Sequence, residues 1–184
     1  MHYDNLIDDV LTLWFGHKPY EAKSFWFAST SEFDTNLALK FGEAYAGARD
    51  GELDHLAETA EGTLTLIILL DQCPRNMFRD DPRAFLTDHK ALTFAKRAVA
   101  KKFDQKLDPL QRVFVYLPFE HSEDLADQEQ SLALFKPMDG YYDYAIKHYD
   151  IIKEYGRFPH RNPVLGRRST EAELTFLTQP NPFG

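Results

Sequence analysis

The sequence predicts an all-α fold in which antiparallel helix pairs surround a central buried helix. Apolar residues recur at helical spacing along most of the 184 residues, and no segment shows the sustained alternation of a strand. Short turns with proline or glycine join the helical segments, which favours antiparallel pairing of neighbours. The central helix is predicted from the aliphatic run at residues 64–70, because an element that is apolar on all sides is buried on all sides.

The central helix is predicted to begin with an N-cap at Gly62-Thr63 and to end near Gln72. Leucine dominates over valine in the aliphatic run, and the neighbouring segments are helical, so a helix is favoured over a buried strand. Pro74 disfavours the α conformation at the residue before it, Cys73. We therefore expect the polar residues that follow the run at a turn close to the buried centre of the protein.

Two helices and a short third one are predicted before the central helix. The first covers residues 3–14, and the second opens at Ser31, where acidic residues follow a cap position. Gly51 separates the second helix from a short helix at residues 53–60. The apolar faces of the first two are formed by Tyr3, Leu6, Ile7, Val10, Leu11 and Trp14, and by Phe33, Leu37, Phe41, Ala44, Tyr45 and Ala48.

The C-terminal half predicts further helices between proline and glycine signals. Asp81-Pro82 and Asp108-Pro109 each place proline at a first helical position. The first of these helical stretches reaches residue 102 with a break near Asp88, and the second is expected to end at Pro118. Helices at 122–135, capped by Ser122, and at 141–152 follow, and the last one begins with the capping box Thr170-x-x-Glu173.

Composition predicts one soluble domain that spans residues 1–184, with a short tail from about residue 179. The net charge of −8 argues against general nucleic-acid binding, which needs a basic surface. The single cysteine, Cys73, fits a reducing compartment, and the acidic N-terminus lacks the layout of a signal peptide. No apolar run approaches the roughly 18 residues that cross a bilayer. We expect a cytoplasmic protein without a nucleic-acid or membrane partner.

Polar side chains concentrate in three stretches: residues 71–79, 116–129 and 155–168. In the first, Asp71 is expected at a helix C-terminus, where the dipole disfavours a carboxylate by roughly 0.3–1 kcal/mol. Arg75 or Arg79 is then the expected cationic partner, either in a structural ion pair or beside a site acid. The third stretch is rich in arginine, which either neutralises acids of the fold or binds an anion through its planar fork.

The second stretch carries the candidate acid–base pair Glu120-His121. A histidine next to a carboxylate suits general acid–base chemistry, although a turn also holds such a pair by hydrogen bonds alone. Asp127 lies four residues after Glu123, and a like-charge pair on one helical face costs roughly 0.2–0.5 kcal/mol unless a cation lies over it. An arginine of the third stretch or a metal would supply that cation.

The sequence gives little sign of a metal or cofactor site. His121, His148 and His160 are scattered, without a zinc-binding spacing. Glu52-x-x-His55 has the spacing of a di-iron ligand pair, but a bundle site needs two such motifs. We therefore expect no metal and no cofactor. His148 falls on an apolar helix face, which is typical of a histidine satisfied within the core.

The first and third stretches share a pattern, because DQCPRN and GRFPHRN each follow an apolar helix with proline, arginine and asparagine. Asparagine in such a turn often hydrogen-bonds its own backbone. Two such turns that face each other would line one pocket, with Asn76 and Asn162 on its walls. That arrangement is a hypothesis at the level of the sequence.

The chain resembles a known family in three long stretches: LDQCPRNMFR (70–79), PFEHSEDLADQE (118–129) and GRFPHRNPVLGRRST (156–170). These are similar to the signatures of an uncharacterised, mostly bacterial family, domain of unknown function 924. The resemblance covers nearly the whole chain, including Trp14-Phe15-Gly16. It implies a TPR-like (tetratricopeptide-like) helical array, although the signature residues of that repeat are not found here. It implies no activity.

Three functions are compatible with these residues. The leading hypothesis is a binding module that takes an anionic small molecule or an acidic peptide in an arginine-lined groove. The alternatives are a hydrolase-type enzyme and an internal salt-bridge network without a ligand; the sequence leaves the oligomeric state open. The candidate catalytic residues are Glu120, His121 and Asp71, and the candidate ligand-binding residues are Arg75, Asn76, Asp127, Arg157, His160, Arg161, Asn162 and Arg167.

Overall fold

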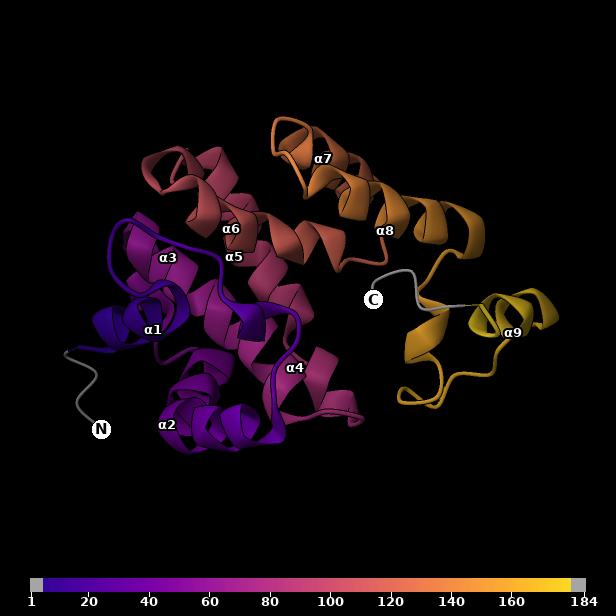
Figure 1. The fold of residues 1–184 in the computed structure, drawn as a ribbon, viewed down its shortest axis with the longest axis horizontal. Helices are drawn as coiled ribbons and strands as arrows, with labels where there is room; N and C mark the ends of the chain where they lie inside the picture. The colour runs from indigo at the N-terminus through magenta and orange to yellow at the C-terminus, as the bar shows by residue number, and fades with distance from the viewer. Residues whose placement is uncertain (1–4, 180–184) are drawn as a thin grey trace. The chain divides into compact units, whose positions relative to one another are not determined.

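The computed structural model describes residues 5–179 and confirms the all-α fold. Every regular element among these residues is helical (Figure 1). Tyr3 of the first predicted apolar face, and the predicted tail beyond residue 179, lie outside the described residues. No helix within residues 5–179 is both long and apolar enough to cross a membrane. The TPR-like arrangement stays a prediction.

The described residues group into two compact units. The first unit contains residues 5–79 and 83–118, and the second contains residues 80–82 and 119–179. The prediction of a single domain over residues 1–184 stays a prediction. The polar stretch at 71–79 lies in the first unit, and the stretch at 155–168 lies in the second.

The first unit contains the longer α-helices of the N-terminal half and several short turns of helix. The α-helices are α1 (Leu6–Phe15), α2 (Ser31–Asp50), α3 (Ala60–Ile67), α4 (Cys73–Met77), α5 (Asp88–Ala100) and α6 (Pro109–Glu120), whose last residues enter the second unit. Short helical turns cover Ser24–Trp26, Asp54–Glu58, Asp104–Lys106 and Pro82–Phe85, the last of which begins with a residue of the second unit. Residues 82–100 thus contain a break before Asp88, as predicted.

Aromatic rings fill the core where α1 meets α6. Trp14 and Phe15 at the end of α1 contact Phe114 edge-to-face, with ring centroids 5.9 Å and 5.4 Å apart. Trp26 joins them at 4.9 Å from Phe114, and its indole N–H donates to the Trp14 carbonyl at 2.9 Å. The predicted first helix therefore ends in the aromatic core of the first unit.

The central helix is buried as predicted, but it begins earlier than predicted. Leu64 and the residues 66–70 have no exposed surface. The N-cap is Thr59, whose hydroxyl accepts from the Gly62 N–H at 3.0 Å, so the predicted cap at Gly62-Thr63 is wrong. A Cβ on Gly62 would lie 2.1 Å from the Leu56 carbonyl oxygen, so only glycine fits this first turn.

The predicted end of the central helix near Gln72 is also wrong. A π-helical turn covers Ile68–Gln72, and α4 continues directly from Cys73, which has φ −55° and ψ −43°. The Cys73 N–H bonds the Ile68 carbonyl, five residues back. A wider turn of this kind accommodates Pro74, which has no N–H for the carbonyl four residues before it.

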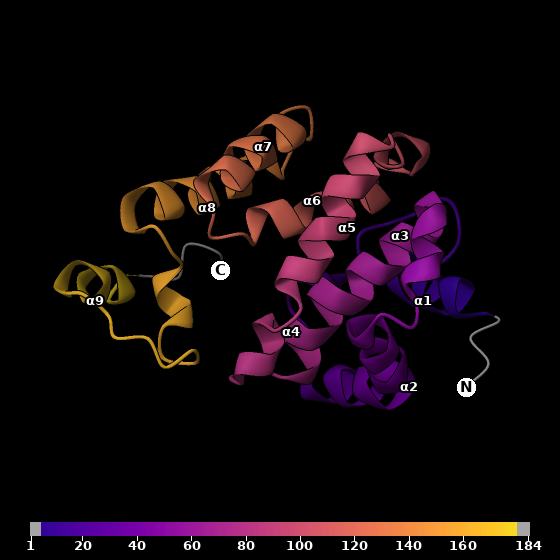
Figure 2. The same ribbon diagram turned by 180° about the vertical axis from the view of Figure 1, so that it is seen from behind.

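Thr87 compensates for the hydrogen bond that Pro74 does not make. The carbonyl in question belongs to Leu70, and the buried Thr87 hydroxyl donates to it at 2.5 Å. A buried carbonyl without a donor costs free energy of unfolding, so this side chain allows the proline inside a buried helix. Thr87 directly precedes α5, which packs beside α3 (Figures 1 and 2).

The second unit is built on a helical hairpin. It contains α7 (Leu125–Phe135), α8 (Tyr142–Tyr155), a short turn at Pro159–Arg161, and α9 (Glu171–Leu177). Helices α7 and α8 lie side by side in both views (Figures 1 and 2). Their core includes Phe135, Ala145, Ile152 and Phe158. The predicted capping box of Thr170 and Glu173 is confirmed at the start of α9.

Two predicted boundaries at the start of the second unit are wrong. Helix α6 continues past Pro118 to Glu120. The amide of Gln128 supports this last turn, since it donates to the carbonyls of Phe119 and Glu120 at 3.3 Å and 2.7 Å. The cap of α7 is Asp124 rather than Ser122, with the Asp124 carboxylate accepting from the first backbone N–H groups of the helix.

Replacing Thr87 by valine should lower the free energy of unfolding by about 1–3 kcal/mol, because the buried Leu70 carbonyl loses its side-chain donor. Denaturant titration of the full chain measures this loss. The matched control is Thr93→Val, since Thr93 is exposed and its hydroxyl donates only within its own helix, to the His89 carbonyl. Equal stability of the two variants would contradict the role assigned to Thr87.

Candidate functional site

Asp71 lies in the π-helical turn of the central helix, with a fully buried side chain. The Gln72 amide donates to one carboxylate oxygen at 2.6 Å, and an Arg75 nitrogen lies 3.4 Å from the other. The expected pairing with arginine is therefore observed with Arg75. Because the helix continues into α4, the expected position of Asp71 at a helix C-terminus is wrong, and the dipole penalty does not apply.

Arg75 is held by acids of its own unit. Its guanidinium forms two bonds to the Asp88 carboxylate, at 2.8 Å and 3.0 Å, and donates to the Asp71 carbonyl at 2.6 Å. Burial by itself would lower the pKa of Arg75, but the charges of Asp71 and Asp88 raise it. Burial, with the charge of Asp71, also raises the pKa of the neighbouring Cys73 thiol, so this cysteine is protonated and inert.

Asn76 of α4 and Arg79, just after α4, bond the first turns of α2 and the loop before it. The Asn76 amide donates to Ser29 and to Asp34, each at 2.8 Å, and Arg79 donates to Asp34 at 2.6 Å. Asn76 therefore does not bond its own turn in the way that its sequence position suggested. Arg79, the other candidate partner of Asp71, forms its ion pair with Asp34.

In the second unit, Glu120 at the end of α6 contacts His148 of α8. The His148 Nδ1 lies 3.1 Å from the Glu120 carboxylate and 2.8 Å from the Tyr144 carbonyl. A carbonyl only accepts, so Nδ1 carries the proton and donates. The carboxylate predicted to work with His121 thus lies beside His148, which the sequence had suggested was a core residue.

Further rings and a guanidinium surround the buried ring of Phe158; we call His121, His148, Phe158, His160 and Arg161 the Phe158 cluster. His148 and His160 lie 5.6 Å and 5.5 Å from Phe158 between ring centroids. The Arg161 guanidinium lies over the Phe158 ring at 4.5 Å and donates to the His121 carbonyl at 3.1 Å. His121 lies 6.3 Å from His148. The second and third polar stretches therefore meet here.

The Phe158 cluster keeps His148 uncharged at neutral pH. Burial first, and then the charges of His121, Arg161 and His160, lower the pKa of His148 to about 3, against the hydrogen bond to Tyr144. The contact with Glu120 is therefore made by a neutral imidazole.

Arg167 is held by Glu123 and Asn162. Its guanidinium forms two bonds to the Glu123 carboxylate, at 2.7 Å and 3.0 Å, and donates to the Asn162 side chain at 2.9 Å. Burial raises the pKa of Glu123, but the bonds from Arg167 and from the Phe158 backbone N–H bring it below the ordinary value. Asn162 donates to Ser169 at 3.0 Å, so it closes the loop before α9.

Asp127 lies on the buried side of α7, where it accepts from the Ser122 hydroxyl at 2.9 Å. Glu123 precedes the N-cap Asp124, so it is outside the helix. The expected like-charge pair of Glu123 and Asp127 on one helical face is therefore wrong. Arg167, an arginine of the third stretch, pairs with Glu123.

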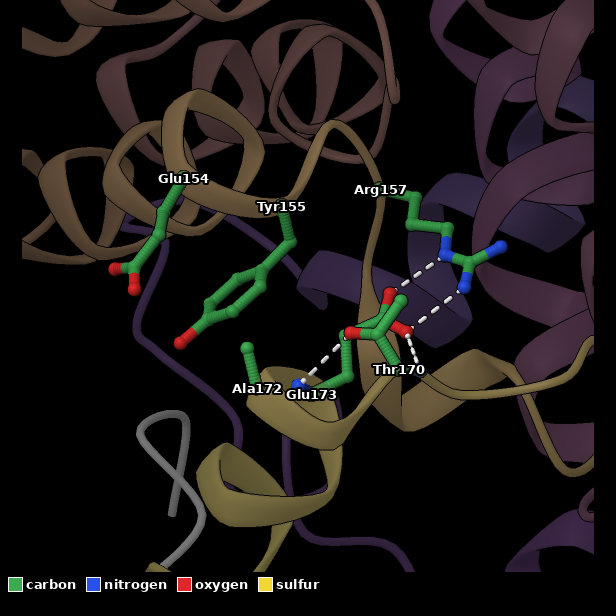
Figure 3. Close-up of a pocket in the computed structure, with 6 residues that line it drawn as sticks. All are labelled: Glu154, Tyr155, Arg157, Thr170, Ala172 and Glu173. Atoms are coloured by element: carbon green, nitrogen blue, oxygen red, sulfur yellow. Dashed lines mark hydrogen bonds and ion pairs between the residues drawn. The ribbon is translucent and has the colours of Figure 1, made fainter.

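A hollow lies between the end of α8 and the start of α9 (Figure 3). In it, Arg157 forms two bonds to Glu173, at 2.6 Å and 2.8 Å, while the Tyr155 ring lies toward Ala172. The same carboxylate accepts from the Thr170 N–H at 2.7 Å. These bonds, the one from Arg157 first, lower the pKa of Glu173 to about 2. Arg157 thus fastens α9 within the second unit.

Sequence reasoning missed Glu173 and His148 as site partners. Glu173 was recognised for its capping position alone, and no local pattern indicates that Arg157 reaches it. His148 lies in the helix one turn after Tyr144, and its apolar neighbours suggested a core residue. Within the part of the chain that the structure describes, no group of three or more histidine, cysteine or acidic side chains is arranged to hold a metal ion.

Comparisons with known proteins agree with this description. A family model described as a bacterial protein of unknown function, DUF924, matches residues 10–181. The chain is also similar to the structure of a protein of unknown function, ATU0120, from Agrobacterium tumefaciens. The two share 38% sequence identity with a TM-score of 0.89, over 96% of this chain and 98% of the other. A comparison with curated proteins found no match.

Asp71→Asn should lower the free energy of unfolding by roughly 3–5 kcal/mol if the carboxylate serves the fold, because it leaves Arg75 without one of its buried partners. Denaturant titration measures the change. The control is Asp9→Asn, which breaks an exposed pair with Lys40 and should cost about 1 kcal/mol or less. An unchanged or increased stability of Asp71→Asn would mean that the carboxylate is retained for a function.

Glu173 should stabilise the chain only above acidic pH. Its pKa is lowered from 4.5 in a model carboxyl group to about 2 in the fold, so its contribution is complete above pH 4.5 and is lost as the pH falls toward 2. The difference in thermal midpoint between wild type and Glu173→Gln should shrink over this range. The exposed Glu171 in the same helical turn provides the control Glu171→Gln. A pH-independent difference would show that charge is not involved.

Proposed function

This chain belongs to the DUF924 family of bacterial proteins of unknown function, and we propose that it is a helical binding module for an anionic small molecule or the acidic end of a peptide. The binding site of this proposal is the Phe158 cluster of the second unit. A cytoplasmic location, which the single buried cysteine favours, is part of the same proposal.

The ion pairs of the chain argue against the groove lined by arginine that the sequence predicted. Arg75, Arg157 and Arg167 each form two bonds to a carboxylate of the chain. A ligand anion would have to compete with these internal acids, and the exchange would gain little. This supports the salt-bridge reading for these three arginines. We place the binding site at His160 and Arg161 because both lie against the ring of Phe158 beside His148.

The observation that carries the proposal is the gathering of two imidazoles and a guanidinium around one apolar ring, with a third imidazole, His121, 6.3 Å from His148. The distances from Phe158 to His148, His160 and Arg161 are between 4.5 Å and 5.6 Å. Crowded groups that carry or accept positive charge repel one another, and an anion placed among them relieves that repulsion. Imidazolium and guanidinium groups also give charge-assisted hydrogen bonds to carboxylate and phosphate oxygens.

Anion binding should be coupled to proton uptake at this cluster. The pKa of His148 is lowered to about 3 by burial and by the charges around it. A bound anion would offset those charges and raise the pKa of His148 again. The hydrogen bond from Nδ1 to the Tyr144 carbonyl already fixes the ring, so protonation at the other nitrogen adds a donor without reorienting the side chain.

The acid–base reading with Glu120, His121 and Asp71 has less support. The Glu120 carboxylate lies 3.1 Å from His148 Nδ1, and Asp71 is bonded by Gln72 and paired with Arg75 within the first unit. General acid–base catalysis needs its groups within hydrogen-bond reach of one reacting atom. The distances between these groups and their own partners favour binding over that reaction.

Inorganic phosphate is the probe for this proposal, titrated into the full chain by isothermal calorimetry. Affinity should rise as the pH falls from about 8 to about 6, because imidazoles gain a proton near pH 6.5. His160→Gln should weaken binding by about tenfold, which corresponds to roughly 1.4 kcal/mol. Titrations in buffers with different ionisation enthalpies would show the proton uptake.

The control variant is His89→Gln, which removes an exposed imidazole from the first unit. It should bind phosphate like the wild type. If the two variants bind equally, or if affinity does not depend on pH, the Phe158 cluster is not an anion site.

A further inference from the structure

Two buried polar atoms on α7 have no hydrogen-bond partner among the residues that the structure describes. They are the Gln128 side-chain oxygen Oε1 and the Ser131 hydroxyl Oγ, and both side chains are completely buried. The two residues are three apart in one helix, so they lie on the same face, one turn from each other. Buried polar groups are nearly always hydrogen-bonded, to protein or to an ordered water.

The orientation of the Gln128 amide is fixed by its other end. Its nitrogen Nε2 donates to the carbonyls of Phe119, Glu120 and Ser122, at 3.3 Å, 2.7 Å and 2.7 Å. A flipped amide would place Oε1, which only accepts, against three other acceptors. Oε1 must therefore face the side where no described protein group donates to it.

Ser131 also lacks the bond that a helical serine usually makes. A serine inside a helix commonly donates to the carbonyl four residues back, here that of Asp127. The Ser131 hydroxyl makes no such bond within the described chain. It is available to bond a group that lies beside Gln128 on the buried face of α7.

We infer that Gln128 and Ser131 bind one internal water molecule. Both side chains leave the same face of α7, one turn apart. One water molecule that makes hydrogen bonds of about 2.8 Å can join two polar atoms on such a face. The water would donate to Oε1 and exchange a hydrogen bond with Oγ, which satisfies both atoms and meets the minimum of two partners for a buried water.

This hydration site would support the end of α6. Gln128 is the side chain that bonds the carbonyls of the last turn of α6 and of Ser122, so it positions the backbone of Glu120. A water on Oε1 holds the amide in the orientation that these bonds need. Gln128 is thus a positioning residue for the Glu120–His148 contact, and this inference is independent of whether an anion binds.

A crystal structure of the full chain at high resolution tests the inference directly. The expected result is an ordered water within roughly 2.7–3.2 Å of both Gln128 Oε1 and Ser131 Oγ. A Ser131 hydroxyl that donates to the Asp127 carbonyl or directly to Oε1, with no water between, would overturn it. An empty apolar void at this position would overturn it as well.

A measurement in solution uses the slow exchange of internal water. Nuclear Overhauser transfer from water to the Gln128 side-chain amide should be seen in the wild type and lost in Ser131→Ala. The control is Gln130→Ala, which changes an exposed residue of the same helix and should leave the signal unchanged. Absence of the transfer in the wild type refutes the site, and this result stands even if Ser131→Ala does not fold.

Discussion

The missing N–H of Pro74 is the constraint on which the centre of the first unit depends. A proline inside a helix removes one backbone bond and crowds the carbonyl four residues before it. Here the helix widens into a π turn at Ile68–Gln72, and the Leu70 carbonyl takes its hydrogen bond from Thr87. The widened turn contains Asp71, so the carboxylate is placed in the fully buried interior. Arg75, one helical turn later, is consequently within reach of both Asp71 and Asp88.

Most arginines of the polar stretches connect segments that are distant in sequence but belong to one unit. Arg75 reaches α5, Arg79 reaches α2, Arg157 reaches α9 and Arg167 reaches the loop before α7. The two-bonded geometry of three of these pairs gives them more directional strength than a single surface contact has. Arg157 and Arg167 of the arginine-rich stretch therefore need no ligand to explain their positions.

The helical architecture was predictable because its signals are local. Spacing of apolar residues gave the buried central helix, and the box of Thr170 and Glu173 gave the start of α9. Pro74 and Pro118 misled the prediction, because whether a proline ends a helix depends on distant donors such as Thr87 and on supporting contacts such as those from Gln128. The partners of the site residues were hard to predict for the same reason, because they depend on contacts between distant segments. The contact of Glu120 with His148 joins residues on different helices, and only the packing of the second unit brings them together.

The Phe158 cluster differs from the arginine pairs in the kind of charge it carries. Guanidinium groups stay charged at every physiological pH, so the charge of Arg167 in its pair with Glu123 does not change in that range. Imidazoles change charge in that range, and their protonation responds to burial and to neighbouring ions. Burial, together with the charges of His121, Arg161 and His160, lowers the pKa of His148 and keeps it neutral. In the binding module that we propose, an anion that entered would raise the pKa of His148, whereas the guanidinium groups of the ion pairs would keep their charge.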